Sequence, residues 1–224
     1  MGNLRFIFSF FFLTSCSSAN DMDHNKPEQQ SSIIEAVKNK QYAVVEAALK
    51  KGTDVETKDE NSKSLLLIAT EANDLEMARL LTAHGGDVNR QDNRLDSPFL
   101  LAGASGQTEF VKLFLSKGAR FDVFNRYNGT ALIPACERGH VEVVRILTTT
   151  KGFPIDHVNR LGWTALMEAV VLGNGGKKHV EIVELLIGAG CNINIPDKDG
   201  VSALQHARSR NLTDIAKLLE KAAR

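Results

Sequence analysis

The chain has 224 residues, 43% of them hydrophobic, and its 27 basic and 27 acidic side chains give a net charge of zero. A balanced charge provides no basic field, so neither nucleic acid nor an anionic membrane surface is expected as a general partner. The hydrophobic content is ordinary for a folded domain.

Residues 1–15 predict a lipoprotein-type signal peptide. Arg5 supplies a positive charge, and residues 6–13 form an apolar run of eight residues. That run is far shorter than the roughly 20 residues of a membrane span, but it suits the apolar core of a signal peptide. The sequence Leu13-Thr-Ser-Cys16 resembles the bacterial lipobox, which makes Cys16 the expected lipidation site. An ordinary signal peptide that ends near a cysteine is the alternative.

Residues 16–30 are predicted to be the lipidated cysteine and a disordered tether. The segment Ser17–Gln30 holds almost no apolar side chains, so it cannot bury enough surface to offset its ordering entropy. As a flexible coil it would hold the following domain on the order of 20 Å from the bilayer. The expected location is the periplasm-facing side of a bacterial envelope, with the membrane contacted only through the lipid. Ser17 resembles the residue that follows the cysteine in outer-membrane lipoproteins.

Five segments farther along the chain share one pattern, in which Ser or Thr opens, Leu or Phe is third and Ala is sixth. They are Ser64–Ala69, Ser97–Ala102, Thr130–Ala135, Thr164–Ala169 and Ser202–Ala207, spaced 33, 33, 34 and 38 residues apart. A period of about 33 residues with a Thr-Pro-Leu-His-x-Ala-like core is typical of ankyrin repeats. The chain resembles the ankyrin-repeat family over residues 31–224.

The pattern also has a direct physical interpretation. The opening Ser or Thr hydroxyl can accept a hydrogen bond from an unpaired amide in the first helical turn. A second helix follows, as in Val141–Leu147, and it ends near a glycine that can adopt positive φ. These glycines are Gly52, Gly85, Gly118, Gly152 and Gly190. The expected fold is an all-α ankyrin solenoid of about six stacked helix-turn-helix repeats joined by β-hairpin-like loops.

The six repeats are expected at approximately 31–58, 59–91, 92–124, 125–158, 159–196 and 197–224. The first lacks a hairpin approach, and the last closes with Leu218–Arg224, which contains Glu220, Lys221 and Arg224. Terminal repeats are atypical because one of their faces meets water. Both ends look finished, so a complete domain is expected.

An insert accounts for the longest interval between repeats. Leu172–His179 contains Gly-Gly-Lys-Lys, but a phosphate-binding loop needs a different glycine spacing, a preceding strand and a Ser or Thr after the lysine. A glycine-rich insert here resembles a recurrent form of exported bacterial ankyrin proteins. Either a partner-contact loop at residues 173–178 or a simple flexible connection fits the sequence.

No catalytic, metal or cofactor site is expected. The six histidines show neither metal-ligand spacing nor a Ser/His/Asp arrangement. His140 and His179 match the Gly-His pattern at the start of the second ankyrin helix, where the resemblance implies hydrogen bonds between repeats. Cys136 and Cys191 occupy positions of small residues, and no disulfide is expected between them. The protein is therefore not expected to be an enzyme.

The ankyrin resemblance implies binding through a concave face made by the hairpin tips and the exposed side of the first helices. Arg and aromatic residues are enriched at interaction hot spots, and they concentrate at the middle tips of this chain. Trp163 has an alternative role, which is to pack against its own hairpin. The candidate partner-binding residues are Lys63, Arg94, Arg126, Tyr127, Arg160 and Trp163.

The expected function is a non-catalytic protein–protein interaction module, monomeric and tethered in the envelope. One alternative is a helper of an envelope oxidative-stress enzyme, because some similar exported ankyrin proteins are linked to peroxide defence. Another is an inhibitor or immunity protein that blocks a toxin or enzyme. An inhibitor should bind very tightly, and its gene should lie beside a toxin gene. A helper should bind more weakly, and its gene should lie near the gene of the enzyme that it serves.

Overall fold

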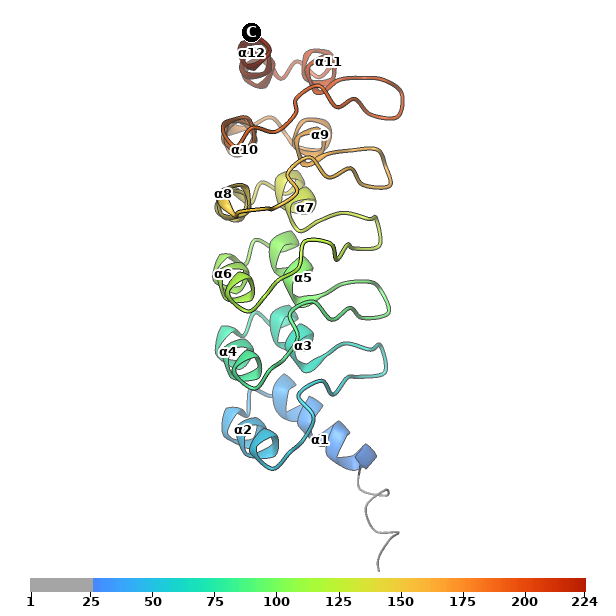
Figure 1. Cartoon of the computed structure of the whole chain (residues 1–224), viewed down its shortest axis with the longest axis vertical. Helices are drawn as coiled ribbons and strands as arrows, with labels where there is room; N and C mark the ends of the chain where they lie inside the picture. Colours follow the sequence, from blue (N-terminus) through green and yellow to red (C-terminus); the bar gives the residue numbers. More distant parts are fainter. Residues whose placement is uncertain (1–25) are drawn as a thin grey trace, which may run out of the picture.

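The computed structural model describes residues 26–224, which form twelve α-helices and no β-strand. Successive helix pairs stack into an elongated array, with hairpin loops projecting on one side (Figure 1). The predicted all-α solenoid of six helix pairs is confirmed. The predicted signal peptide and Cys16 lie outside the described residues.

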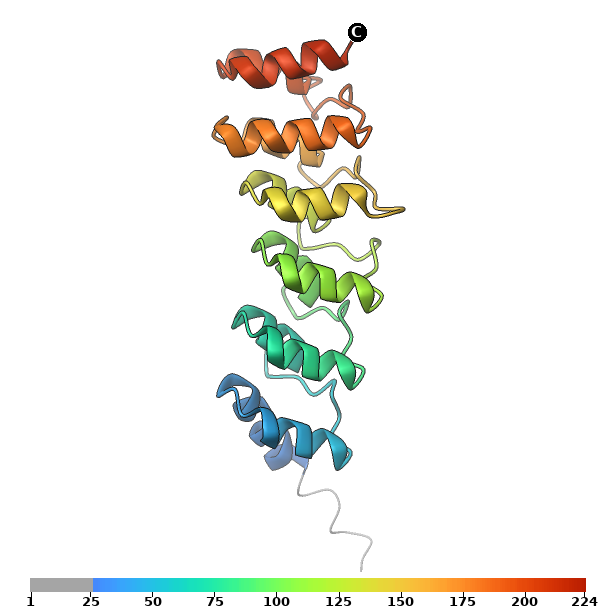
Figure 2. The same ribbon diagram turned by 90° about the vertical axis from the view of Figure 1, so that its left-hand side faces the viewer.

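The helices form two layers. The inner layer, next to the hairpins, contains α1 (Lys26–Lys38), α3 (Leu65–Glu71), α5 (Pro98–Ala104), α7 (Leu132–Glu137), α9 (Ala165–Val171) and α11 (Ala203–Ser209). The outer layer contains α2 (Tyr42–Lys50), α4 (Leu75–Ala83), α6 (Thr108–Ser116), α8 (Val141–Thr149), α10 (Lys177–Gly188) and α12 (Thr213–Ala222). Figure 2 shows the outer helices one above another along the stack.

The first helix starts earlier than the predicted first repeat. The sequence analysis places the tether up to residue 30, whereas α1 begins at Lys26. Pro27 stands in its first turn, where a proline is tolerated because the amides of that turn have no intrahelical acceptor. No helix within residues 26–224 combines the length and the apolar character needed to cross a membrane.

Four of the five predicted capping residues act as expected. The hydroxyl oxygens of Ser64, Ser97, Thr164 and Ser202 each accept a hydrogen bond from the amide three residues later, at 3.1–3.2 Å. This bond satisfies one of the unpaired amides at a helix start. The predicted glycines also behave as expected, because all five have φ between 79° and 94° just after an outer helix.

The prediction is wrong at Thr130, whose buried hydroxyl has no hydrogen-bond partner. In the other repeats, the amide four residues after the capping residue donates to its carbonyl, as Glu168 does to Thr164 at 3.0 Å. The equivalent residue here is Pro134, which has no amide hydrogen. Without that bond the first turn does not close around Thr130, and α7 begins one residue late, at Leu132.

One continuous apolar core runs from Ile33 in α1 to Leu219 in α12. Leu132 lies in its middle and is completely buried. Its helix packs against α5, α8 and α9, and therefore against both neighbouring repeats. Each helix pair covers the apolar face of the next, so stability is shared between neighbours.

Replacing Leu132 with alanine should lower the free energy of unfolding by about 2–5 kcal/mol, because it leaves a cavity where two inter-repeat contacts meet. Denaturant titration of the variant measures the change. The control is Val44→Ala on α2, since Val44 is 51% exposed and its loss should cost less than about 0.5 kcal/mol. Equal effects of the two substitutions would contradict the assignment of Leu132 to the core.

Candidate functional site

The five hairpin tips are all built on the same side-chain hydrogen bonds. An Asp or Asn stands five residues before each helix-opening Ser or Thr, and its Oδ1 accepts from the amides two and four residues later, at 2.8–3.0 Å. Such side chains mimic a backbone turn. The sequence analysis missed this device, although the recurring acid or amide was the available signal. These residues are Asp59, Asp92, Asn125, Asn159 and Asp197.

Neighbouring tips are also joined through their backbones. The amide of Arg160 donates to the carbonyl of Tyr127 at 2.8 Å, and its guanidinium donates to the carbonyl of Arg126 at 3.1 Å. The ammonium of Lys198 in the sixth repeat donates to the carbonyl of Arg160. The tips of the fourth, fifth and sixth repeats therefore form a connected edge.

Three of the six predicted binding residues lie together on that edge. Arg126, Tyr127 and Arg160 are all exposed. The guanidinium of Arg126 lies 5.0 Å from the ring centroid of Tyr127 and 3.4 Å from the carboxylate of Asp96. The cation–π contact and the ion pair both restrict the Arg126 side chain.

The other three predicted residues have different surroundings. Lys63 is engaged in its own repeat, since its ammonium lies 2.7 Å from the carboxylate of Glu71. Arg94 is exposed, and its guanidinium lies 3.9 Å from the carboxylate of Asp96, which Arg126 also contacts. Trp163 is half-buried and packs against the apolar core.

A pocket of about 330 Å³ opens between the fourth and fifth tips and the inner helices. We call it the tip–helix pocket. Tyr127, Leu161 and Leu172 are 47–51% exposed and give it an apolar margin. Its lining comprises Asn125, Arg126, Tyr127, Gly129, Ile133, Pro134, Glu137, Arg138, Asn159, Leu161, Glu168 and Leu172.

Glu168 on α9 is the buried acid of this pocket. It is only 4% exposed, and its Oε1 accepts a hydrogen bond from Nδ2 of Asn159 at 2.8 Å. Burial raises the pKa of Glu168 to about 7; the nearby charge of Glu137 adds to the rise, and the Asn159 bond opposes it. The sequence analysis missed this residue. The available signal was a glutamate in the repeat position that Ile68 and Leu101 fill elsewhere.

The insert after α9 is held by specific contacts. A side chain at Gly173 would put its Cβ 2.1 Å from the carbonyl oxygen of Ala169, so the close approach requires glycine. His179 bonds through Nδ1 to Asn174 and through Nε2 to the carbonyl of Glu137, both at 2.9 Å. The second contact is the inter-repeat hydrogen bond that the resemblance implied.

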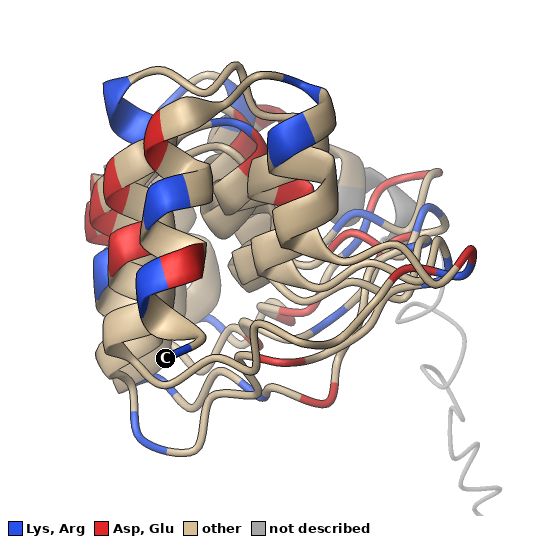
Figure 3. Ribbon diagram, turned by 90° about the horizontal axis from the view of Figure 1, so that it is seen from above, with Lys and Arg blue, Asp and Glu red and all other residues tan. Residues whose placement is uncertain are grey.

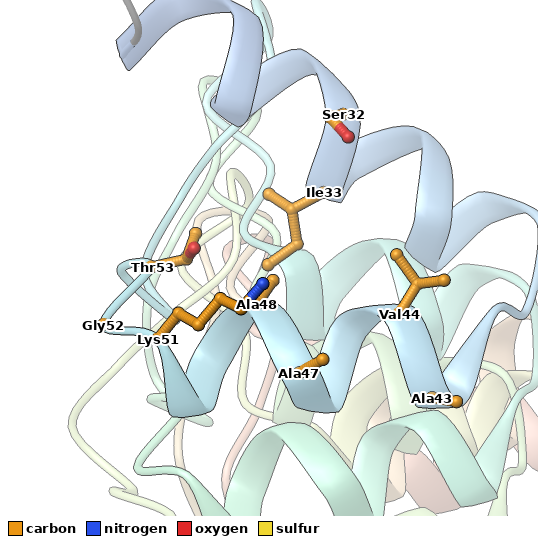
Figure 4. Close-up of a pocket in the computed structure, with 9 residues that line it drawn as sticks. All are labelled: Ser32, Ile33, Ala43, Val44, Ala47, Ala48, Lys51, Gly52 and Thr53. Carbon is orange, nitrogen blue, oxygen red and sulfur yellow. The ribbon is translucent and has the colours of Figure 1, made fainter.

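Two further features lie away from the tips. A hollow of about 550 Å³ at the N-terminal end of the described stack is lined by α1, α2 and the following turn, including Ile33 and Val44 (Figure 4). Cys136 is buried in α7 and Cys191 is half-buried after α10. Burial raises the pKa of the Cys136 thiol far above its usual range and that of Cys191 to about 12, which suits packing residues rather than nucleophiles.

Charge is mixed over the molecule. Seen along the stack, basic and acidic residues are interspersed on the helices and the hairpin loops (Figure 3). Within residues 26–224, no group of three or more His, Cys, Asp and Glu side chains is arranged to hold a metal ion.

The model of the family described as "Ankyrin repeats (3 copies)" matches residues 9–92, 33–125 and 99–197. The chain belongs to the ankyrin-repeat family. A curated relative named as an ankyrin repeat protein, YahD of Escherichia coli K12, is 33% identical over 80% of this chain and 73% of its own length.

Solved ankyrin structures agree with the fold. An ankyrin repeat domain from Acinetobacter baumannii AYE is 45% identical, covers 87% of this chain and 98% of its own, and superposes with a TM-score of 0.84. The ankyrin repeat protein EF0377 is 36% identical, covers 84% of this chain and 96% of its own, and has a TM-score of 0.82. Ankyrin repeats are in general non-catalytic scaffolds that bind proteins, and this chain has the same architecture.

The raised pKa of Glu168 predicts a pH-dependent stability. A carboxyl group with a higher pKa in the folded state contributes stability below its ordinary pKa of 4.5 and loses that contribution as the pH rises through about 7. The free energy of unfolding of the wild type should therefore fall across this window relative to that of Glu168→Gln. Urea titrations at several pH values measure the difference. Glu184→Gln, which changes an exposed glutamate on α10, should follow the wild type; parallel wild-type and Glu168→Gln profiles would contradict the burial effect.

Proposed function

We propose that this ankyrin protein is a non-catalytic module tethered in a bacterial envelope, and that it binds a protein partner through the tips of the fourth and fifth repeats. The observation that carries the proposal is the exposed group of Arg126, Tyr127 and Arg160 beside the tip–helix pocket. Ankyrin repeats are protein-binding scaffolds in general, and the middle tips combine the residue types that dominate interaction hot spots.

Rigidity favours these tips as a binding surface. The side chain of Asn125 fixes the turn that carries Arg126 and Tyr127, and Asn159 fixes the turn that carries Arg160. The backbone bond from Arg160 to Tyr127 then sets the spacing between the two tips. Side chains on ordered backbone lose less conformational entropy on association, so more of their contact energy remains as affinity.

The envelope location rests on the sequence alone. The Leu13–Cys16 lipobox motivates a lipid anchor at Cys16, followed by a polar segment that leads to the repeats. Two or three acyl chains would anchor the protein firmly, because each buried methylene contributes about 0.8 kcal/mol. The periplasm-facing side of the outer membrane is the proposed site of action.

Alanine at Arg126, Tyr127 and Arg160 together should weaken partner binding at least about thirtyfold, or roughly 2 kcal/mol. The partner is first captured from the native envelope with the lipidated full-length protein as bait, and its affinity is then measured with the purified components. Thermal unfolding should change little, since these exposed side chains contribute little to the core. The control, Lys112→Ala with Arg145→Ala on the outer helices, should keep wild-type affinity. Wild-type affinity in the folded triple variant would move the site elsewhere, first to residues 173–178.

Cys16 should carry the lipid anchor. Metabolic labelling with a fatty-acid analogue should mark the wild-type protein, and Cys16→Ala should lose both the label and its fractionation with membranes. Cys191→Ala is the control for a general effect of removing a thiol and should retain both. Label retained in Cys16→Ala would refute the lipobox assignment.

A further inference from the structure

We propose that the tip–helix pocket receives the side chain of a lysine or arginine from the protein partner, with its aliphatic part against Tyr127 and Leu172 and its cationic end at Glu168. This inference rests on the proposed protein-binding function and specifies the chemistry that the partner presents. It concerns an acidic pocket behind the tips rather than the tips themselves.

The first argument is the unused bonding capacity of Glu168. Among the described residues, the bond from Asn159 to Oε1 is the one side-chain hydrogen bond of Glu168, which leaves Oε2 available to a donor. The side chain is 96% buried and lines the pocket. A buried carboxylate is costly unless a donor or a cation satisfies it. The open pocket is the side from which such a group can reach it.

The second argument is the distribution of charge. Arg126 and Arg138 also line the pocket, but both guanidinium groups are directed to the preceding repeat. Arg126 lies 3.4 Å from Asp96, and Arg138 donates to the carbonyl of Ala104 at 2.7 Å. Neither arginine bonds to Glu168. Glu137 acts on Glu168 as a neighbouring like charge, so an entering cation would be attracted by two carboxylates.

The sixth repeat provides an internal comparison. His206 occupies the repeat position of Glu168, and Asp197 occupies that of Asn159. The Nε2 of His206 lies 2.7 Å from the carboxylate of Asp197. There the acid is paired with a basic side chain of the same chain. In the fifth repeat the acid is bonded to the neutral amide of Asn159, which leaves room for a basic partner from outside the chain.

The shape of the pocket selects a long basic side chain rather than a bare ion. Tyr127, Leu161 and Leu172 make its margin apolar, and the carboxyl group lies deeper. Lysine and arginine combine an apolar stem with a charged end and pack in this way at apolar surfaces. A metal ion would need more ligands than these two carboxylates offer.

Binding should depend on pH through Glu168. The ionisable groups on the neighbouring elements include Glu137 at the end of α7, Arg138 just after it, and Arg126 on the neighbouring tip. His179 lies on α10 and His206 on α11. The other charged residues on these two helices are Lys177, Lys178, Glu181, Glu184 and Arg208. His179 is bonded to Asn174 and the backbone of Glu137, and His206 is bonded to Asp197. Glu137 is the charged neighbour that raises the pKa of Glu168. The ionised fraction of Glu168 should rise from roughly a tenth at pH 6 to nine-tenths at pH 8.

The first test uses n-butylammonium and n-propylguanidinium, which reproduce the lysine and arginine side chains, on the purified protein. Carboxyl carbon-13 NMR should show saturable shifts at Glu168 and a fall in its pKa on binding. Affinity should be roughly tenfold higher at pH 8 than at pH 6, because the cation binds the ionised form. n-Butanol has the same stem as n-butylammonium without the charge, and it should bind at least tenfold more weakly.

Matched variants identify the binding group. Glu168→Gln keeps the acceptor for Asn159 and should abolish cation binding, and Glu184→Gln on the outer layer should retain it. Equal binding of n-butanol and n-butylammonium, or no shift at Glu168 with either cation, would overturn the proposal. So would cation binding that survives in folded Glu168→Gln.

A second measurement separates this inference from the proposed function. Affinity for the captured partner should fall at least tenfold in Glu168→Gln, and replacing the critical lysine or arginine of the partner should have the same effect. A partner that needs Arg126, Tyr127 and Arg160 but binds Glu168→Gln normally would overturn this inference and leave the proposed function intact.

Discussion

The structure depends on one constraint: no helix pair of this chain can cover its own apolar face. The inner helices have only six or seven residues in five of the six repeats, which is too short for independent stability in water. They persist because each is buried between two neighbours in a core that continues from α1 to α12. The positions of the hairpins follow from that stacking, since each hairpin connects one packed pair to the next.

The hairpin tips convert regular stacking into a surface with defined geometry. An Asp or Asn side chain closes every tip, so the tip residues occupy the same backbone positions in each repeat and are free to vary in side chain. Asn159 connects this device to the pocket, because its Oδ1 holds the turn while its Nδ2 bonds to Glu168. An aspartate could accept the turn bonds but could not donate to Glu168. In the fifth repeat, the side-chain amide of Asn159 therefore holds the hairpin turn and Glu168 in fixed positions relative to each other.

Most of the fold could be predicted from the sequence because local and tertiary requirements coincide. Ser64 and Gly85 stand where capping and positive φ are needed, and the period of about 33 residues places them in successive copies. The exposed group of Arg126, Tyr127 and Arg160 was also predictable, since repeat positions stack. The missing cap at Thr130 could not be predicted from that residue alone. It arises because Pro134, four residues later, has no amide hydrogen to donate to the carbonyl of Thr130. Glu168 required knowledge of burial, which depends on the neighbouring repeats.

Three departures from the repeat pattern line the tip–helix pocket. Pro134 removes a helical amide, Glu168 puts an acid in the repeat position that Ile68 and Leu101 fill elsewhere, and Leu172 is exposed where the insert begins. Each departure carries a stability cost: an unpaired hydroxyl at Thr130, a desolvated carboxyl group and an exposed apolar side chain. Natural sequences violate local consistency chiefly at functional sites. Similar costs occur elsewhere, such as the exposed side chain of Leu95, but the three around this pocket are of the kind that the proposed binding of a partner there would offset.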